Sequence, residues 1–365
     1  ASAASGSGSG SSSSSAFAYA NDKMSVGGFQ TCAILDSGDL TCWGLDNQGQ
    51  LGNGATTGNL NSPPSTAIDL GTGRTAVSVS AGHYHTCAIL DNGELKCWGE
   101  DIYGQLGDGL PKSSTTAPST TAIDLGTGRT AVAVSAGNAH TCAILDNGDL
   151  KCWGSTNHGR LGMGVITFTG GQPSPPSTAI DLGTGRTAVA VSAGEEHTCA
   201  ILDNGDMKCW GRDMSGVLGD GGTYSDINSP SSTAIDLGTG RTAVAMDAHR
   251  YHVCAVLDNG DVKCWGNDQF GQLGDGGPQT NLNVPSSTAI DLGTGRTAVA
   301  VATGNAFSCA LLDNGDVKCW GRDANGQLGN GGTITADQNS PPSTAIDLGT
   351  GRTAVGLDGG EDHVC

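Results

Sequence analysis

Six times along the chain a cysteine is followed ten residues later by Cys-Trp-Gly, and this repeat limits what the chain can fold into. The first cysteines recur at intervals of 55, 55, 57, 55 and 55 residues. A thirteenth cysteine, Cys365, stands 56 residues after Cys309, at the first-cysteine position of a seventh unit. Repetition at such a period is typical of a solenoid, propeller or array, and it outweighs any local secondary-structure pattern.

Each repeat has the pattern of a four-stranded antiparallel sheet. In the second unit, four segments are predicted to be strands, at residues 75–82, 85–90, 95–99 and 121–125. The segments DNGE at 91–94 and GTGR at 126–129 have the composition of turns. No segment has a helical period. Short strands repeated in this way indicate propeller blades.

The turn chemistry sets the register of the central hairpin. A two-residue turn would pair Cys87 with Trp98, whereas a three-residue loop with Gly93 in the left-handed conformation pairs Cys87 with Cys97. That position is a non-hydrogen-bonded pair, with Cα atoms roughly 4.5 Å apart, which a disulfide accepts. We therefore predict six disulfides: Cys32–Cys42, Cys87–Cys97, Cys142–Cys152, Cys199–Cys209, Cys254–Cys264 and Cys309–Cys319.

The alternative role for these cysteines is metal binding. Zinc sites usually use closely spaced pairs such as C-x2-C, and here the two cysteines of a unit are ten residues apart. Disulfides are therefore favoured, and no cofactor or metal is expected. Persistent disulfides imply an oxidising compartment, so we expect the protein to be extracellular or at the cell surface.

The charge of the chain excludes nucleic acid as its main partner. The formal net charge is −19, and 11 of the 17 basic residues are repeat arginines and lysines spread evenly over the units. No concentrated basic patch is left to neutralise phosphates. No apolar run of about 18 residues is present, so no membrane insertion is expected.

The segment GHYHTCAILDNGELKCWG (82–99), followed by YGQLGDG (103–109), resembles the repeat of the regulator of chromosome condensation family. The match recurs in all six complete units. The resemblance implies an all-β, seven-bladed β-propeller of four-stranded antiparallel blades, truncated here within the seventh repeat. The chain differs from the nuclear members in its cysteine pairs, its acidity and its lack of a basic tail, so no exchange-factor residues are transferred to it.

The repeat boundaries divide the chain into two parts. Residues 1–16 are rich in serine and glycine and are predicted to be a flexible linker. Residues 17–365 are predicted to be the propeller, with repeats at approximately 17–74, 75–129, 130–186, 187–241, 242–296 and 297–352 and a partial repeat at 353–365.

Residues repeated in every unit are interpreted as structural. The histidines two positions before each first cysteine are predicted to be structural hydrogen-bonding residues rather than a metal ring, since Gln30 and Phe307 interrupt the series. The DNGD-type turns lack the distal Glu of a calcium loop. The tryptophans of Trp-Gly could bind sugars, but packing between blades is favoured. No hydrolase, metalloprotease or nucleotide motif is present, so no enzyme is predicted.

Residues that differ between units indicate where function lies. In a simple meander, the loop between the first two strands and the segment after Trp-Gly lie on one face of the disc, and the DNGD and GTGR turns lie on the other. Loops on a rigid scaffold are where binding residues concentrate. The predicted binding face comprises His83, Tyr84, Tyr103, Glu195, Glu196, Arg250, Tyr251 and Phe270.

Serine- and proline-rich tracts in the long loops favour O-glycosylation, with Ser62, Ser174, Ser229 and Ser340 as candidate sites. Two functions remain open. The first is a non-enzymatic structural or adhesive module, repeated along an extracellular filament or cell-surface assembly, with itself or other extracellular components as partners. The second is a dedicated protein- or glycan-binding propeller, inhibitor-like or lectin-like, that uses the variable face.

Overall fold

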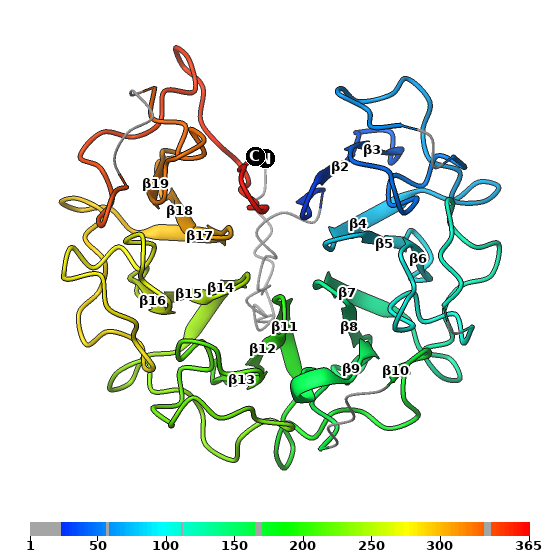
Figure 1. The fold of residues 1–365 in the computed structure, drawn as a ribbon, viewed down its shortest axis with the longest axis horizontal. Coiled ribbons are helices and arrows are strands. Elements are labelled where there is room, and N and C mark those ends of the chain that lie inside the picture. Colours follow the sequence, from blue (N-terminus) through cyan, green and yellow to red (C-terminus); the bar gives the residue numbers. More distant parts are fainter. Residues whose placement is uncertain (1–22, 56–57, 111, 165–169, 332–336) are drawn as a thin grey trace, which may run out of the picture.

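The strands of the chain form six antiparallel sheets that follow one another around a central axis (Figure 1). The computed structural model describes residues 23–55, 58–110, 112–164, 170–331 and 337–365, so the predicted linker at 1–16 lies outside the described residues. The only helix in these ranges is the short 3-10 turn η1 at Asn157–Gly159. The predicted all-β class is confirmed.

Each sheet contains a meander of three successive strands, with its first strand nearest the axis and its third toward the rim, and one sheet has a fourth strand (Figure 1). The first three sheets consist of β1 (Met24–Val26), β2 (Gln30–Ile34) and β3 (Leu40–Gly44); β4 (Ala76–Ala81), β5 (His85–Leu90) and β6 (Leu95–Gly99); and β7 (Ala131–Ala136), β8 (His140–Leu145), β9 (Leu150–Ser155) and β10 (Gly171–Gln172). The other three consist of β11 (Ala188–Ala193), β12 (His197–Leu202) and β13 (Met207–Gly211); β14 (Ala243–Ala248), β15 (His252–Leu257) and β16 (Val262–Gly266); and β17 (Ala298–Thr303), β18 (Phe307–Leu312) and β19 (Val317–Gly321).

The predicted hairpin register is confirmed. Cys87 lies opposite Cys97, Gly93 has φ 78°, and the amide of Leu90 donates to the carbonyl of Glu94 over 2.8 Å. All six predicted disulfides are formed, with Cα–Cα distances of 4.0–4.1 Å. These distances are typical of non-hydrogen-bonded cross-strand pairs. Cys365 is free and exposed.

The prediction of four regular strands in every blade is wrong. The segment 121–125 is not a strand: it is attached to β6 by one backbone bond from Ile123 to Leu95, and nearby Thr115 forms an isolated bridge to Gly99. A fourth strand of two residues, β10, occurs only in the third sheet among the described residues. Proline explains the difference, because it has no N–H to donate and interrupts the ladder in these segments.

The hydrophobic core lies between neighbouring sheets. One cluster contains Leu40 and Leu51 of the first unit together with Leu90 and Trp98 of the second, and similar clusters follow around the ring. Five of the six Trp-Gly tryptophans are 0% exposed, which confirms the predicted packing between blades. Each blade therefore completes the core of its neighbour.

Residues 353–365 begin a further antiparallel hairpin between the sixth and first sheets (Figure 1). Asp358 and Cys365 exchange two backbone hydrogen bonds, each 3.0 Å long. On one side Asp358 contacts β1 through the amide of Val26 at 2.6 Å, and on the other the carbonyl of Glu361 accepts from the amide of Asn305 at 3.2 Å.

Candidate functional site

The variable loops lie together on one face, as the meander predicts. The amide of Glu100, just after β6, donates to the carbonyl of Tyr84 in the loop between β4 and β5, over 2.9 Å. The same contact joins Arg212 to Glu196 and Asn267 to Tyr251. We call this side, with the loops between the first two strands and those after each third strand, the variable face.

The opposite side carries the uniform turns, and we call it the turn face. Five of the six GTGR arginines there pair with the first Asp of the next DNGD-type turn: Arg74–Asp91, Arg129–Asp146, Arg186–Asp203, Arg241–Asp258 and Arg296–Asp313, at 3.2–3.4 Å. The partners are 35–38% exposed, so each pair contributes little to stability. The repetition indicates a structural function for this face.

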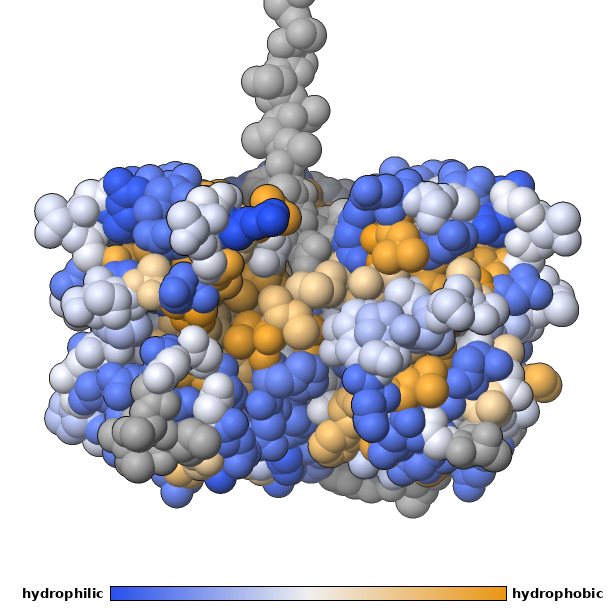
Figure 2. Space-filling model, turned by 90° about the horizontal axis from the view of Figure 1, so that it is seen from above, coloured by the Kyte–Doolittle hydropathy of each residue, from blue (hydrophilic) through white to orange (hydrophobic). Residues whose placement is uncertain are grey.

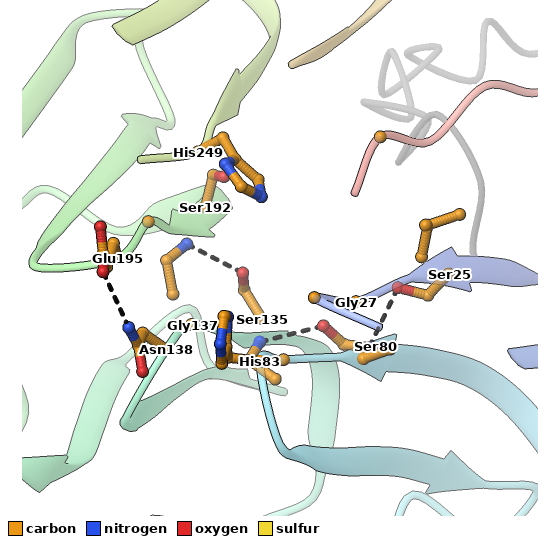
Figure 3. A pocket seen from close by; sticks show the side chains of 18 of the residues that line it. Ser25, Gly27, Ser80, His83, Ser135, Gly137, Asn138, Ser192, Glu195 and His249 are labelled. Atoms are coloured by element: carbon orange, nitrogen blue, oxygen red, sulfur yellow. Dashed lines mark hydrogen bonds between the residues drawn. The ribbon is translucent and has the colours of Figure 1, made fainter. Parts of the chain in front are cut away.

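A cavity of about 110 Å³ lies at the axis, on the side of the variable face. Its wall consists of the ends of innermost strands and the loops that follow them (Figure 3), together with Asp358, Gly359 and Glu361. The cavity therefore collects side chains from most of the ring at one place.

A ring of inter-blade hydrogen bonds forms the floor of this cavity. In six of the seven units, one residue near the axis accepts a bond from a backbone amide of the next blade, as Ser80 does from Ala136 at 2.9 Å and Ser135 from Ala193 at 2.9 Å (Figure 3). At this position the seven units carry Ser25, Ser80, Ser135, Ser192, Asp247, Ala302 and Asp358. The two aspartates thus flank the one position without a polar side chain.

The two aspartates place carboxyl groups on the floor. Asp247 accepts from the amide and the hydroxyl of Thr303 at 2.6 and 2.8 Å. Asp358 accepts from the amide of Val26. Burial, followed by the neighbouring charge of Asp247, raises the pKa of Asp358 to about 7. Neither aspartate was among the predicted site residues.

Charged and aromatic side chains surround the mouth. Glu195 accepts from Asn138 at 3.1 Å (Figure 3). Glu195 also pairs with Arg250 at 2.6 Å, and His83 lies 3.5 Å from Glu361. Phe29, 44% exposed, has its ring centroid 5.2 Å from that of His83, and the Tyr84 ring meets His83 edge-on at 4.3 Å and lies tilted at 6.0 Å from Phe29. This aromatic cluster, Phe29, His83 and Tyr84, spans the first two blades.

The structure brings some predicted binding residues together and separates others. His83 and Glu195 line the cavity, and Tyr84 and Arg250 are beside it. Tyr251 lies under the guanidinium of Arg250, at 4.8 Å from its ring centroid. Glu196, Tyr103 and Phe270 do not line the cavity.

Glu196 belongs to a second charged group on the variable face. Arg160 and Arg212 both bond its carboxylate, and His158 lies 3.8 Å from it. Arg160 is almost completely buried, and its guanidinium also donates to the carbonyl of Glu195 at 3.0 Å. Tyr103 is 38% exposed, and Phe270 stacks with Arg322 at 5.3 Å.

The repeated histidines are held by hydrogen bonds between blades. The hydroxyl of Thr141 donates to the carbonyl of Gln105, so it accepts the proton of His85 Nε2 at 2.9 Å. Burial, with a smaller contribution from His83, lowers the pKa of His85 to about 3 and keeps it neutral. His197 lacks this partner because Val253 replaces the threonine. The predicted structural role of these histidines is supported.

The remaining predictions concern metal and sugars. Within the described ranges, no three His, Cys, Asp or Glu side chains are grouped so that they could bind a metal ion. Ser62, Ser229 and Ser340 are exposed and Ser174 is partly buried, so all four remain candidate O-glycosylation sites. Among the described residues, no helical stretch has the length and apolarity that a transmembrane helix needs.

A ring of antiparallel sheets around an axis, with repeated contacts that fasten each blade to the next, defines a β-propeller. The chain belongs to the family of RCC1-like domains, since the model of that family matches residues 12–365. The family predicted from the repeat is thereby confirmed.

Individual proteins are similar to most of this chain. The ultraviolet-B receptor UVR8 of Arabidopsis thaliana is 28% identical over 369 residues, covering 87% of this chain and 80% of UVR8. The E3 ubiquitin-protein ligase HERC2 of Homo sapiens is 28% identical over 82% of this chain, which corresponds to only 6% of HERC2. The solved structure of Prp20p of Saccharomyces cerevisiae has a TM-score of 0.77 and 19% identity, covering 93% of this chain and 80% of that one.

Proposed function

We propose that the protein is a non-enzymatic, extracellular propeller that binds other proteins through its variable face, in a structural or adhesive role. In the fuller form of this proposal it is a repeating, O-glycosylated subunit of an extracellular filament or cell-surface assembly. The observation that carries the proposal is the difference between the faces. The turn face repeats one ion pair five times, whereas the variable face has a different set of side chains in each blade.

Two further observations support this proposal. The six disulfides are stable in oxidising compartments, which favours an extracellular location. The yeast relative Prp20p is described by its binding to Gsp1p and histones, so the fold is suited to binding proteins. Fold similarity does not transfer those partners to this chain.

The aromatic cluster favours a second candidate, a dedicated glycan- or protein-binding propeller. Exposed aromatic rings provide a flat apolar surface with polar edges, which suits both sugar rings and protein partners. Phe29 and Tyr84 lie beside a polar cavity, where a ligand could combine stacking with hydrogen bonds.

For the fold, we propose a ring of seven blades. The hairpin at 353–365 supports this proposal, because it occupies the interval between the sixth and first sheets and contacts both. His363, at the histidine position of this unit, lies 3.2 Å from Thr31 of the first blade, just as His85 contacts Thr141.

Cross-linking of the protein in its native extracellular material tests the proposed function. A carboxylate-reactive reagent is suitable because the chain has 36 acidic residues, while its repeat lysines are buried. We expect intermolecular links at Glu195, Glu196 and Glu100 and few at the DNGD turns. Links mainly at the turns would show that the wrong face has been chosen.

Charge reversal at matched arginines sharpens this test. Arg250→Glu on the variable face is expected to abolish assembly or binding, while Arg129→Glu on the turn face leaves it unchanged, as measured by sedimentation and electron microscopy. Equal effects of the two substitutions would contradict the proposal. Mass spectrometry of the native protein should detect sugars on Ser62, Ser174, Ser229 or Ser340, and unmodified peptides would exclude the glycosylated form.

A further inference from the structure

The axial cavity is bounded by two rings of hydrogen bonds between blades. In the floor ring, serine and aspartate side chains accept from backbone amides of the next blade. In a second ring, nearer the mouth, loop amides donate to backbone carbonyls of the next blade, as His83 does to Gly137 at 3.2 Å and Glu195 does to His249 at 3.1 Å. The amides of both rings are therefore not free to bind an anion.

The side chains of the cavity are rich in carboxyl groups. Four such residues line it: Asp247, Asp358, Glu195 and Glu361. Arg250 pairs with Glu195, and His83 lies beside Glu361, so these two groups offset at most the two glutamates. Asp247 is bonded by Thr303 and Asp358 by Val26, and neither partner is charged. A cavity with this excess of carboxyl groups attracts cations.

His249 adds a nitrogen atom without a partner. The other six units have glycine at this position: Gly27, Gly82, Gly137, Gly194, Gly304 and Gly360. Nδ1 of His249 is buried and forms no hydrogen bond with any described residue. Burial lowers the pKa of His249, which favours the neutral ring, and a neutral imidazole has one nitrogen that accepts. Figure 3 shows this ring across the cavity from His83. A buried nitrogen without a partner, beside a polar cavity, indicates a missing ligand atom.

The size and surroundings of the cavity limit what it accepts. About 10–15 Å³ holds one water molecule, so the cavity, at about 110 Å³, admits an unbranched group of several non-hydrogen atoms. At the edge of the disc in Figure 2, hydrophilic side chains cover the margins of both faces and apolar ones lie in the layer between them. A ligand that approaches from a face therefore meets charge and hydrogen-bonding groups first.

The aromatic cluster at the mouth provides the apolar contact that a slender cation needs. Phe29 is 44% exposed, and Tyr84 and His83 are partly exposed beside it. Aromatic faces pack against methylene groups and attract cations. A ligand with a charged end and an aliphatic stem would thus find a partner for each part.

We propose that the axial cavity binds a primary ammonium group, carried by a lysine side chain of a protein partner. The ammonium would lie between Asp247 and Asp358, with Nδ1 of His249 as a further acceptor, and the aliphatic stem would pass the aromatic cluster. The inference rests on the proposed function, in which the partner approaches the variable face. A free aliphatic amine has the same chemistry, so the experiment separates these two sources.

Binding of a cation should displace a proton from Asp358. Burial, followed by the charge of Asp247, raises the pKa of this carboxyl to about 7, and an ammonium beside it favours the ionised form. At about pH 6.5, roughly 0.7 proton should therefore leave for each ligand bound. The other titratable groups around Asp358 are Asp247, His249, Glu361 and Cys365.

Isothermal titration calorimetry with n-propylammonium chloride tests the site on the purified protein. We expect a dissociation constant in the millimolar range, with a binding enthalpy that differs between phosphate and imidazole buffers by the heat of the released proton. Sodium propionate, which has a negative end on the same chain, should not bind. Binding of methyl glucoside but not of propylammonium would assign the cavity to sugars and overturn the proposal.

Three variants separate the groups of the site. Asp358→Asn should weaken propylammonium binding at least about tenfold and abolish the proton release. His249→Gly, which restores the residue of the other units, should weaken binding about fivefold and keep the proton release. Asp146→Asn on the turn face should change neither. Melting temperatures confirm that each variant is folded. Equal affinities in Asp358→Asn and Asp146→Asn, or no binding at about 100 mM propylammonium, would overturn the proposal.

A capped glycine pentapeptide with a central lysine, compared with its norleucine analogue, distinguishes a partner lysine from a free amine. The lysine peptide should bind at least about tenfold more tightly than the analogue, and propylammonium should compete with it. Binding of propylammonium without binding of the lysine peptide would refute the partner lysine and leave a small amine as the ligand. Intermolecular cross-links at Glu195 in the native material, together with no amine binding, would retain the proposed function and remove only this inference.

Discussion

The two faces of the disc are built from the same repeat but are held together differently. On the turn face, exposed arginines and aspartates form the same pair five times, and glycines with positive φ make the turns. On the variable face, charged groups are linked into networks that differ between blades, and one of their members, Arg160, is 4% exposed. The same scaffold thus carries exposed ion pairs, which contribute little to stability, on the turn face and a partly buried charge network on the variable face.

This difference shows how a repeat chain separates architecture from function. A residue needed to form a blade is needed in every unit, so it recurs. A residue that contacts one partner is needed once, so it departs from the repeat. In the fifth unit Asp247-Ala248-His249 stands where the fourth has Ser192-Ala193-Gly194, and both departures line the axial cavity.

The largest expected effect is at Arg160. Arg160→Met keeps the apolar stem but removes the bonds to the carbonyls of Asn157 and Glu195 and to the Glu196 carboxylate. Breaking a buried charge network of this kind costs about 3 kcal/mol in free energy of unfolding. Urea denaturation measures it, with Arg129→Met on the turn face as the control. A loss no larger than that of the control would show that the networks of the two faces are equivalent.

The next effect is a pH dependence at the axial cavity. The folded-state pKa of Asp358, about 7, lies above its ordinary value of 3.8, so the folded protein holds a proton that the unfolded chain has lost between these values. This carboxyl therefore contributes most to stability below pH 4, and its contribution falls as the pH rises to 7, by about 2 kcal/mol after allowance for its partial exposure. The buried histidines His85, His197 and His252, whose pKa values burial lowers to about 3, contribute a slope of the opposite sign.

Asp358→Asn isolates this group. The amide oxygen still accepts from Val26, and the fall in stability that Asp358 contributes between pH 4 and 8 should be missing from the variant when the denaturation of the two proteins is compared. Asp101 and Asp268, whose pKa values burial raises to about 6, contribute a slope of the same sign that the substitution leaves. An unchanged slope in Asp358→Asn would contradict the prediction.

A smaller effect is expected at the glycine of a DNGD turn. Gly148 has φ 81°, and a Cβ there would lie 2.6 Å from Thr187 Cβ, so Gly148→Ala adds a steric conflict to the strain of a left-handed residue. We expect a loss of about 2 kcal/mol. Gly185→Ala, at φ 71° with nothing within 4 Å, should show the strain alone, at about 1 kcal/mol. Equal losses would show that the contact with the next blade is immaterial.

The smallest effect is at the turn-face ion pairs. Arg129→Ala removes a pair whose partners are 37% and 36% exposed and should cost no more than about 0.5 kcal/mol, less in high salt. Thermal denaturation at two salt concentrations measures it. A loss comparable with that at Arg160 would remove the contrast between the faces.

The sequence was sufficient to predict the hairpins because their determinants are local. The Asn-Gly turn and the alternation of side chains fix the register between Cys87 and Cys97 within a few residues of chain. The outer edge of the sheet was predicted incorrectly. The proline-rich segment contacts β6 only at isolated positions, and no alternation of side chains in the sequence marks those positions.

The candidate site was predicted only in part. Differences between units pointed to His83, Glu195 and Arg250, because their loops vary visibly. Asp247 and Asp358 were missed because they stand at a position that carries serine in the first four units, and a comparison of Ser192 with Asp247 would have found the first of them. The burial of Arg160 depends on the neighbouring blade, which the local sequence does not specify.

The placement of the disulfides has a mechanical consequence. Every bridge closes a hairpin inside one blade, and none joins two blades. Under tension applied through the chain ends, the contacts between blades should therefore break first, one unit at a time. The residues between the two cysteines of each disulfide cannot be extended while that disulfide is intact. A fibre of such units would lengthen in steps and recoil, with reduction of the bridges increasing the length of each step rather than the number of steps.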